Sequence, residues 1–181
     1  IYGYGMTTTS GGNLSILDED GNLGISPAGT DKGRLRPEDV VCVTPGGDRN
    51  GIHPPSSEYP FHQAIYERRP DVRAVLHAHP PALVSFSILG RLPDTRVVPK
   101  AAHICGEVGF APYEIPGSAA LGQSIADTFA RGHKTVLLEN HGVVTVGSSL
   151  TNAFQRFETL DFCARLILKA SILGDVRSLR A

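Results

Sequence analysis

Short apolar runs separated by turn residues mark the predicted strands of this chain. Two runs, at 13–17 and 23–26, flank the turn sequence Asp18-Glu-Asp-Gly-Asn22, which predicts a β-hairpin. A run at 40–44 ends at a Pro-Gly-Gly turn and predicts a short strand. Runs at 74–79, 135–139 and 143–146 predict buried strands, and a weaker strand is predicted at 96–98.

Helix signals alternate with these strands. Helices are predicted at 57–69, 81–89 and 118–132, each with Ser or Pro at its start and Pro or Gly at its end. The longest helix is predicted from Ser149 onward, because apolar residues recur there at helical spacing. Strands joined by hairpins argue against a purely parallel sheet. The pattern predicts an α/β fold with a central, largely antiparallel sheet and helices on both faces.

Length and charge narrow the class of protein. The chain has 181 residues, which fits a single domain over 1–181, and it begins with Ile1, so we expect an N-terminal segment and a C-terminal tail to be missing. The net charge of −1 provides no basic field for nucleic acid or an anionic membrane, and no apolar stretch is long enough to span a bilayer. Three cysteines without a CxxC motif favour a reducing, cytoplasmic setting.

Histidines at the ends of two strands are the strongest chemical signal. His77 and His79 close the run at 74–79, and because strand side chains alternate, both point to the same side. His141 follows the run at 135–139 in the sequence Asn140-His141-Gly142. Three imidazoles with one open position are the protein ligands of a catalytic zinc site. The sequence therefore predicts that these histidines bind one Zn²⁺.

Three loops of small residues are candidates for anion binding. Ser56 and Ser57 stand where a loop becomes a helix, and exposed N–H groups and the helix dipole favour an anion there. The loops Ser10–Asn13 and Ser26–Thr30 carry glycines that let backbone N–H groups approach an oxyanion. Read singly, each loop is an ordinary turn or cap, and only their combination favours a binding site.

Two further groups have more than one interpretation from the residues alone. Glu58 follows the predicted helix cap and could favour the helix dipole or serve as a base. His62 lies on the same helix and either packs or faces a partner, whereas His103 is a loop histidine or a proton donor.

Taken in order, these motifs resemble the class II aldolase/adducin family, and within it the fuculose-phosphate aldolases. The resemblance implies a three-layer sandwich, a homotetramer with sites at subunit interfaces, and a divalent metal on His77, His79 and His141. It also implies that Glu58 is a further ligand or the base. The matching segments are Gly12-Asn13, Ser26-Pro27-x-Gly29, Pro55-Ser56-Ser57-Glu58 with His62, His77-x-His79-Pro80 and Asn140-His141-Gly142.

The resemblance further implies a substrate and a reaction. Asn13, Gly29, Ser56 and Ser57 would hold the phosphate of a sugar phosphate. The reaction would be aldol cleavage of a fuculose-phosphate-like ketose to dihydroxyacetone phosphate and an aldehyde, through a metal-stabilised enediolate. Fuculose-phosphate aldolase uses a tyrosine as proton donor to the aldehyde, but residues 96–105 contain none, which leaves Lys100 or His103 as substitutes.

Other activities of the same scaffold stay open. A decarboxylase of hydroxy acids, a dehydratase or an epimerase would use the same kind of enolate. The epimerases typically carry Asp where this chain has Glu58, which counts against that reaction. A non-catalytic, adducin-like assembly domain would have no reason to keep the histidines and Glu58 together.

Overall fold

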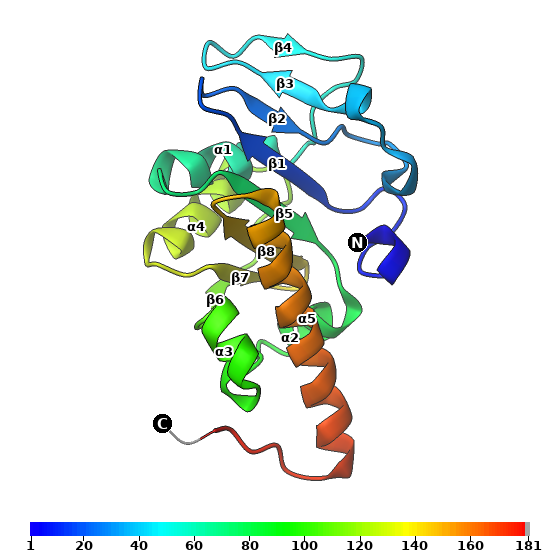
Figure 1. The fold of residues 1–181 in the computed structure, drawn as a ribbon, viewed down its shortest axis with the longest axis vertical. Coiled ribbons are helices and arrows are strands. Elements are labelled where there is room, and N and C mark those ends of the chain that lie inside the picture. The colour runs from blue at the N-terminus through cyan, green and yellow to red at the C-terminus, as the bar shows by residue number, and fades with distance from the viewer. Residues whose placement is uncertain (180–181) are drawn as a thin grey trace.

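One eight-stranded sheet runs through the computed structural model, which describes residues 1–179. Its strand order is β4-β3-β2-β1-β5-β8-β7-β6, and every neighbouring pair is antiparallel except β6 and β7 (Figure 1). The strands are β1 (Asn13–Leu17), β2 (Leu23–Ile25), β3 (Val41–Val43), β4 (Arg49–Asn50), β5 (Ala74–Ala78), β6 (Gly109–Ala111), β7 (Thr135–Leu138) and β8 (Gly142–Gly147).

Helices cover the two faces of this sheet. α1 (Tyr59–Arg68) and α4 (Ala119–Ala130) pack together on one face, whereas α2 (Pro81–Ile88) and α5 (Leu150–Leu173) lie on the other, with α3 (Pro99–Cys105) against α5 (Figure 1). Short 3-10 helices occur at Tyr2–Tyr4, Lys32–Arg34, Pro37–Asp39 and Thr95–Val97. The fold is therefore a three-layer sandwich, and the prediction of a largely antiparallel sheet between helices is confirmed.

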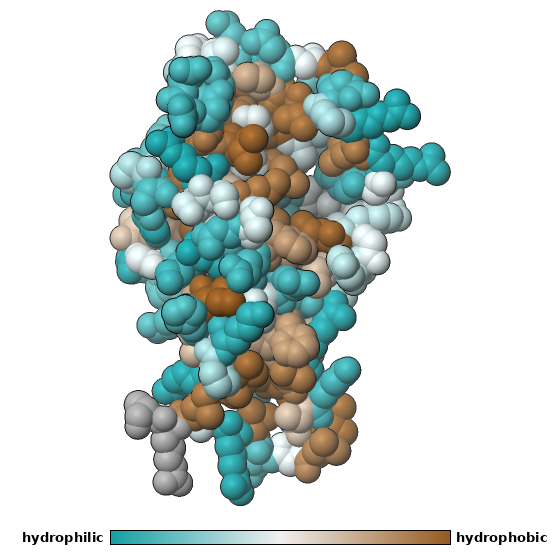
Figure 2. All heavy atoms as spheres, in the orientation of Figure 1, coloured by the Kyte–Doolittle hydropathy of each residue, from teal (hydrophilic) through white to brown (hydrophobic). Residues whose placement is uncertain are grey.

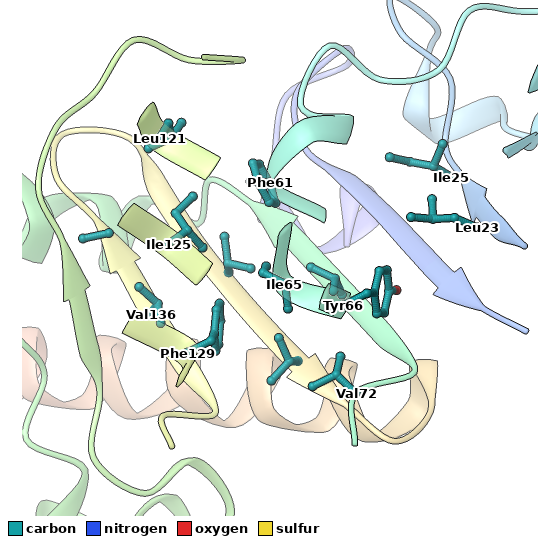
Figure 3. Close-up of a cluster of buried hydrophobic side chains, with 14 of the residues drawn as sticks. Leu23, Ile25, Phe61, Ile65, Tyr66, Val72, Leu121, Ile125, Phe129 and Val136 are labelled. Atoms are coloured by element: carbon teal, nitrogen blue, oxygen red, sulfur yellow. The ribbon is translucent and has the colours of Figure 1, made fainter. Parts of the chain in front are cut away.

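Alternation along the strands divides the core between the two faces. In β5, Val75 belongs to the cluster under α1 and α4, whereas Leu76 belongs to the cluster under α2 and α5. Figure 3 shows the first cluster, in which Phe61 and Ile65 of α1 meet Phe129 of α4 over the sheet. Burying large apolar side chains of this kind contributes roughly 1.5–3 kcal/mol each. This packing fixes the strand ends from which the histidines project.

The strands β1 to β3 have a helix on one face only. Leu23 and Ile25 point into the cluster under α1, but Ile16 is 45% exposed on the opposite face. Figure 2 views the molecule from the side of α5 and shows hydrophobic side chains among hydrophilic ones over this open part.

Within residues 1–179, no helix is long and apolar enough to cross a membrane.

Several predicted boundaries hold and others change. The hairpin of β1 and β2, the strands β3, β5, β7 and β8, and the caps Ser118 and Ser149 are confirmed. The strand predicted at 96–98 is wrong: Asp94 accepts a hydrogen bond from the Arg96 backbone and begins a 3-10 helix. Residues 100–106, read as a loop, contain most of α3, and β6 was not predicted.

The start of α1 also differs from its prediction. Glu58, not Ser57, is the residue at the N-cap, and it makes no side-chain capping bond. Instead, the Ser56 hydroxyl accepts from the Glu58 backbone N–H at 3.3 Å. The Glu58 carboxylate is therefore not used to cap the helix and is free to make other contacts.

Candidate metal centre

The predicted histidines meet at one place. His77, His79 and His141 each offer a ring nitrogen, and these nitrogens all lie within 4.8 Å of one another. The Nε2 atoms of His77 and His79 are 3.1 Å apart. His77 is the side chain of β5 opposite Asn13 of β1, and His141 stands in the turn between β7 and β8. Their donor atoms and spacing fit a divalent cation.

Two glycines allow this close approach. At Gly142, a Cβ would lie 2.6 Å from the Ala78 carbonyl oxygen and 3.0 Å from the His79 ring. At Gly12, where φ is +75°, a Cβ would lie 2.7 Å from the His77 carbonyl oxygen. Any larger residue would push the strands apart. Gly12 was interpreted above as part of an anion loop. Its need for glycine is explained instead by close packing against β5.

The protonation of His77 suits a metal ligand. Its Nδ1–H donates to the Val143 carbonyl at 3.0 Å, since a carbonyl can only accept, and this leaves the Nε2 lone pair toward the other rings. Burial lowers the pKa of His77 to about 3, and burial with the neighbouring His77 lowers that of His79 to about 3. Both rings are therefore neutral near pH 7, as ligands must be.

Glu58 completes the cluster from the start of α1. Its Oε2 lies 3.3 Å from His77 Nε2, and its Oε1 lies 3.5 Å from His141 Nε2. With His77 neutral, the first of these contacts is not an ion pair. Oε1 is buried and has no hydrogen-bond partner among the described residues. A buried carboxylate oxygen without a partner is costly, and a cation beside the imidazoles would satisfy it.

Asn13 contacts Glu58 through its side-chain amide. Its side-chain N–H donates to Glu58 Oε2 at 2.7 Å, and its carbonyl oxygen lies 2.5 Å from His62 Nε2. His62 is completely buried and stacks on Phe61 with ring centroids 4.4 Å apart. Of the two roles considered for His62, the structure shows the packed one. Asn13 therefore lies beside Glu58, and it also lines a cavity with Ser26, whose carbonyl accepts from the Ser56 backbone.

The remaining anion candidates lie on two adjacent loops. The Ser56 backbone donates to the Ser26 carbonyl at 3.1 Å, and the Ala28 backbone donates to the Pro54 carbonyl at 3.0 Å. These bonds bring the loop with Gly29 beside the loop with Ser57. Gly29 has a left-handed φ of +65° with open space around it, and Ser57 is exposed. Their backbone and hydroxyl donors are accessible to an incoming anion.

Lys32 is a nearby residue that the sequence reading did not single out. It lines a cavity of about 220 Å³ together with Asn13, Ser26 and His77. Its Nζ donates to the Pro27 carbonyl at 2.7 Å, and burial lowers its pKa. A lone lysine in a polar loop has no motif that announces such a position, so only the fold could identify it.

The two proposed substitutes for the family tyrosine are not part of this cluster. Lys100 and His103 are exposed on α3, and in residues 1–179 neither forms a hydrogen bond or ion pair with the histidines or Glu58. Within the described residues, the cluster therefore contains three histidines that could hold a metal and a carboxylate, but no group identified as a second proton donor.

Comparisons with known proteins agree with this geometry. The family model of the class II aldolase and adducin N-terminal domain matches residues 1–168. A 3-oxo-tetronate 4-phosphate decarboxylase of Escherichia coli O6:H1 is 37% identical, over 94% of this chain and 81% of that protein.

Solved structures show the same fold. YgbL from Escherichia coli superposes with a TM-score of 0.90 at 35% identity, covering 99% of this chain and 88% of its own. An L-fuculose 1-phosphate aldolase superposes with a TM-score of 0.87 at 30% identity, covering 98% and 84%. The metal-site geometry and these matches lead to one conclusion: the chain belongs to the class II aldolase and adducin family.

Proposed function

We propose that this chain is a metal-dependent decarboxylase that converts a 3-oxo-tetronate 4-phosphate to dihydroxyacetone phosphate and CO₂. The observation that carries this proposal is the 37% identity to a decarboxylase of that substrate over nearly the whole chain. The prediction of aldol cleavage as the main reaction gives way to the decarboxylase alternative, although both would break a carbon–carbon bond beside a ketone.

The metal would be held by His77, His79 and His141, with Glu58 adjacent. We propose zinc, because a set of three imidazoles is its common catalytic ligand set. When bound, a divalent cation would supply Lewis-acid stabilisation of the negative charge that develops on the ketone oxygen. The partnerless Oε1 of Glu58 and the neutral His77 ring support this assignment.

The balance of protons favours decarboxylation over aldol cleavage. In the proposed reaction the C1–C2 bond breaks, its electrons form an enediolate at C2 and C3, and CO₂ leaves without needing a proton transfer. Glu58, which first takes a proton from solvent, then gives it to C2 and returns to the carboxylate. Aldol cleavage, in contrast, requires a base to take the hydroxyl proton of the departing aldehyde. The absence of tyrosine from residues 96–105 supports the reaction that needs no such group.

The phosphate would be held on the side of the small-residue loops. Asn13, Gly29, Ser56 and Ser57 would hold it: the two serines stand just before α1, and the loop with Gly29 lies beside them. Lys32 offers a positive charge next to that loop. Fixing the phosphate would orient the reacting end of the substrate toward Glu58 and the metal.

The test compares two reactions with the same enzyme preparation. Purified protein with a measured metal content is given 3-oxo-tetronate 4-phosphate and, separately, fuculose 1-phosphate and 5-deoxyribulose 1-phosphate. Release of dihydroxyacetone phosphate is followed in each case. The proposal expects the highest kcat/KM for the oxo acid, and a higher value for either ketose phosphate would establish aldol cleavage instead.

Aldol cleavage is the second candidate because the fuculose-phosphate aldolase structure is 30% identical. Both reactions leave the enediolate of dihydroxyacetone phosphate, so the same metal and base would serve.

A homotetramer and a cytoplasmic location stay proposals. Light scattering of the metal-loaded protein tests whether it is a tetramer.

A further inference from the structure

We infer that a buried polar ladder, formed by Asn13, Ser15, His62 and Tyr66, positions the Glu58 carboxylate. This inference rests on the proposed role of Glu58 as the group that carries the proton. The ladder begins with Asn13 Nδ2 at 2.7 Å from Glu58 Oε2 and continues with His62 Nε2 at 2.5 Å from Asn13 Oδ1. Ser15 Oγ then lies 2.7 Å from His62 Nδ1 and 2.8 Å from the Tyr66 hydroxyl.

The ladder joins one face of a helix to one face of a strand. Glu58, His62 and Tyr66 are spaced by four residues at and along α1, and Asn13 and Ser15 alternate along β1. Each member is at most 8% exposed. Polar groups in a core are favourable only when each is satisfied, so this arrangement specifies one geometry.

The direction of every bond follows from Glu58. A carboxylate only accepts, so the Asn13 amide must turn its N–H₂ toward it and its oxygen toward His62. That oxygen requires a proton on His62 Nε2, which leaves Nδ1 as an acceptor for the Ser15 hydroxyl. The Ser15 oxygen then accepts from Tyr66. One proton arrangement satisfies the whole ladder.

His62 is the member that holds Asn13 in the orientation set by Glu58. An amide could rotate by 180° and present its oxygen to Glu58, which would repel the carboxylate. The Nε2–H of His62 opposes this rotation, because it would then face the amide N–H₂ of Asn13, and stacking on Phe61 and the Ser15 hydroxyl keep the ring in place. The ladder holds Glu58 in place rather than conducting protons, since an amide does not relay a proton readily.

The experiment compares His62→Leu with His62→Gln, which can still donate to Asn13. The readout is exchange of hydrogen for deuterium in dihydroxyacetone phosphate, followed by proton NMR, because it reports proton transfer whichever group leaves. A displacement near 1 Å can cost about 10²-fold in rate, so we expect a loss of about that size for His62→Leu. His62→Gln should recover most of the rate, with KM and bound metal unchanged in both variants.

Two further variants separate positioning from stability. Ser15→Ala removes the hydroxyl that fixes the His62 ring, and we expect a smaller loss of exchange rate than for His62→Leu. Ser87→Ala is the matched control, because Ser87 is an equally buried serine on α2 whose hydroxyl, among residues 1–179, bonds only to the Val84 carbonyl. It should keep the wild-type exchange rate. Equal exchange in Ser15→Ala, folded His62→Leu and wild type would overturn the inference.

A measurement independent of activity tests the proton arrangement itself. Nitrogen-15 NMR of the zinc-loaded protein should show His62 protonated on Nε2 only. A proton on Nδ1 would reverse the ladder and overturn the inference. If the wild-type protein exchanges no hydrogen of dihydroxyacetone phosphate, the proposed function fails, and the tautomer of His62 still decides whether Asn13 donates to Glu58.

Discussion

The histidines and the anion loops differ in how the fold supports them. His77 lies in β5, His79 directly follows it, and His141 stands in the turn between β7 and β8. Helices cover both faces of these strands. Gly29 and Ser57 follow β2 and β4, in the half of the sheet that has a helix on one face only. His77 is 1% exposed, whereas Gly29 and Ser57 are exposed to solvent.

This difference separates two tasks. A metal site needs ligands held by close packing, because misplaced ligands lose affinity. A loop that binds the unreactive end of a substrate can vary without disturbing that packing. We therefore expect changes among the histidines to abolish turnover, and changes in the loops to alter mainly the substrate that is accepted.

The largest effect is expected from His79→Ala. His79 is only partly buried, so its loss should leave the core intact, unlike that of His77, which also bonds to Val143. Losing the metal removes several kcal/mol of charge stabilisation, which corresponds to a fall in kcat/KM of about 10³-fold or more. Elemental analysis should show less than one metal ion per chain. A variant that keeps stoichiometric metal and normal turnover would show that His79 is not a ligand.

Glu58→Gln should have the second largest effect. The amide keeps the size of the side chain and an oxygen that can accept from Asn13, but it removes the basic group. Losing general acid–base catalysis typically lowers kcat by about 10²–10⁴-fold. Metal content, measured in the same sample, should be unchanged. Near-normal turnover on the true substrate would show that Glu58 is only a residue at the start of α1 and not the base beside the metal.

Ser57→Ala tests the other side of the comparison. A hydrogen bond to a charged group contributes about 1.5–3 kcal/mol, so kcat/KM for a phosphorylated substrate should fall by about 10–100-fold. The change should fall mostly on KM, since phosphate contacts exist before and during the reaction. Steady-state kinetics of wild type and variant, with a phosphorylated substrate and with its unphosphorylated counterpart, measure this change in KM. Equal kcat/KM for both substrates, unaffected by the variant, would rule out a phosphate site at these loops.

The sequence predicted the meeting of the three histidines better than it predicted the surroundings of Glu58. Spacing alone placed His77 and His79 on one side of a strand, because strand geometry is local. Asn13 and Glu58 are 45 residues apart, and their contact exists only because β1 and α1 pack together. The four-residue spacing of Glu58, His62 and Tyr66 was present in the sequence, but no local rule identifies its partner strand.

The same limit explains the missed elements. Val97 and Val98 favour a strand by composition, yet Asp94 caps a turn there and Pro99 starts α3 immediately afterwards. The signals for α3 were readable, since Pro stands at its start and Gly106 ends it with a φ of +66°. A helix as short as α3 depends on packing against α5, which the sequence does not display.

The smallest effect is expected far from both regions, at the cap of α5. The Ser149 hydroxyl accepts from the Asn152 backbone, and replacing such a cap by Ala costs about 0.5–2 kcal/mol of unfolding free energy. For a chain of this size, 1 kcal/mol lowers Tm by about 2–4 °C, measurable by calorimetry. Turnover per folded molecule should stay at the wild-type value. The helix α5 packs against β5 and β8, on the face of the sheet opposite to α1 and Glu58, and we expect it not to contact substrate. A parallel loss of bound metal would instead show that the strands covered by helices on both faces transmit small changes in packing to the histidines. That result would weaken the distinction between a rigid metal site and adaptable loops.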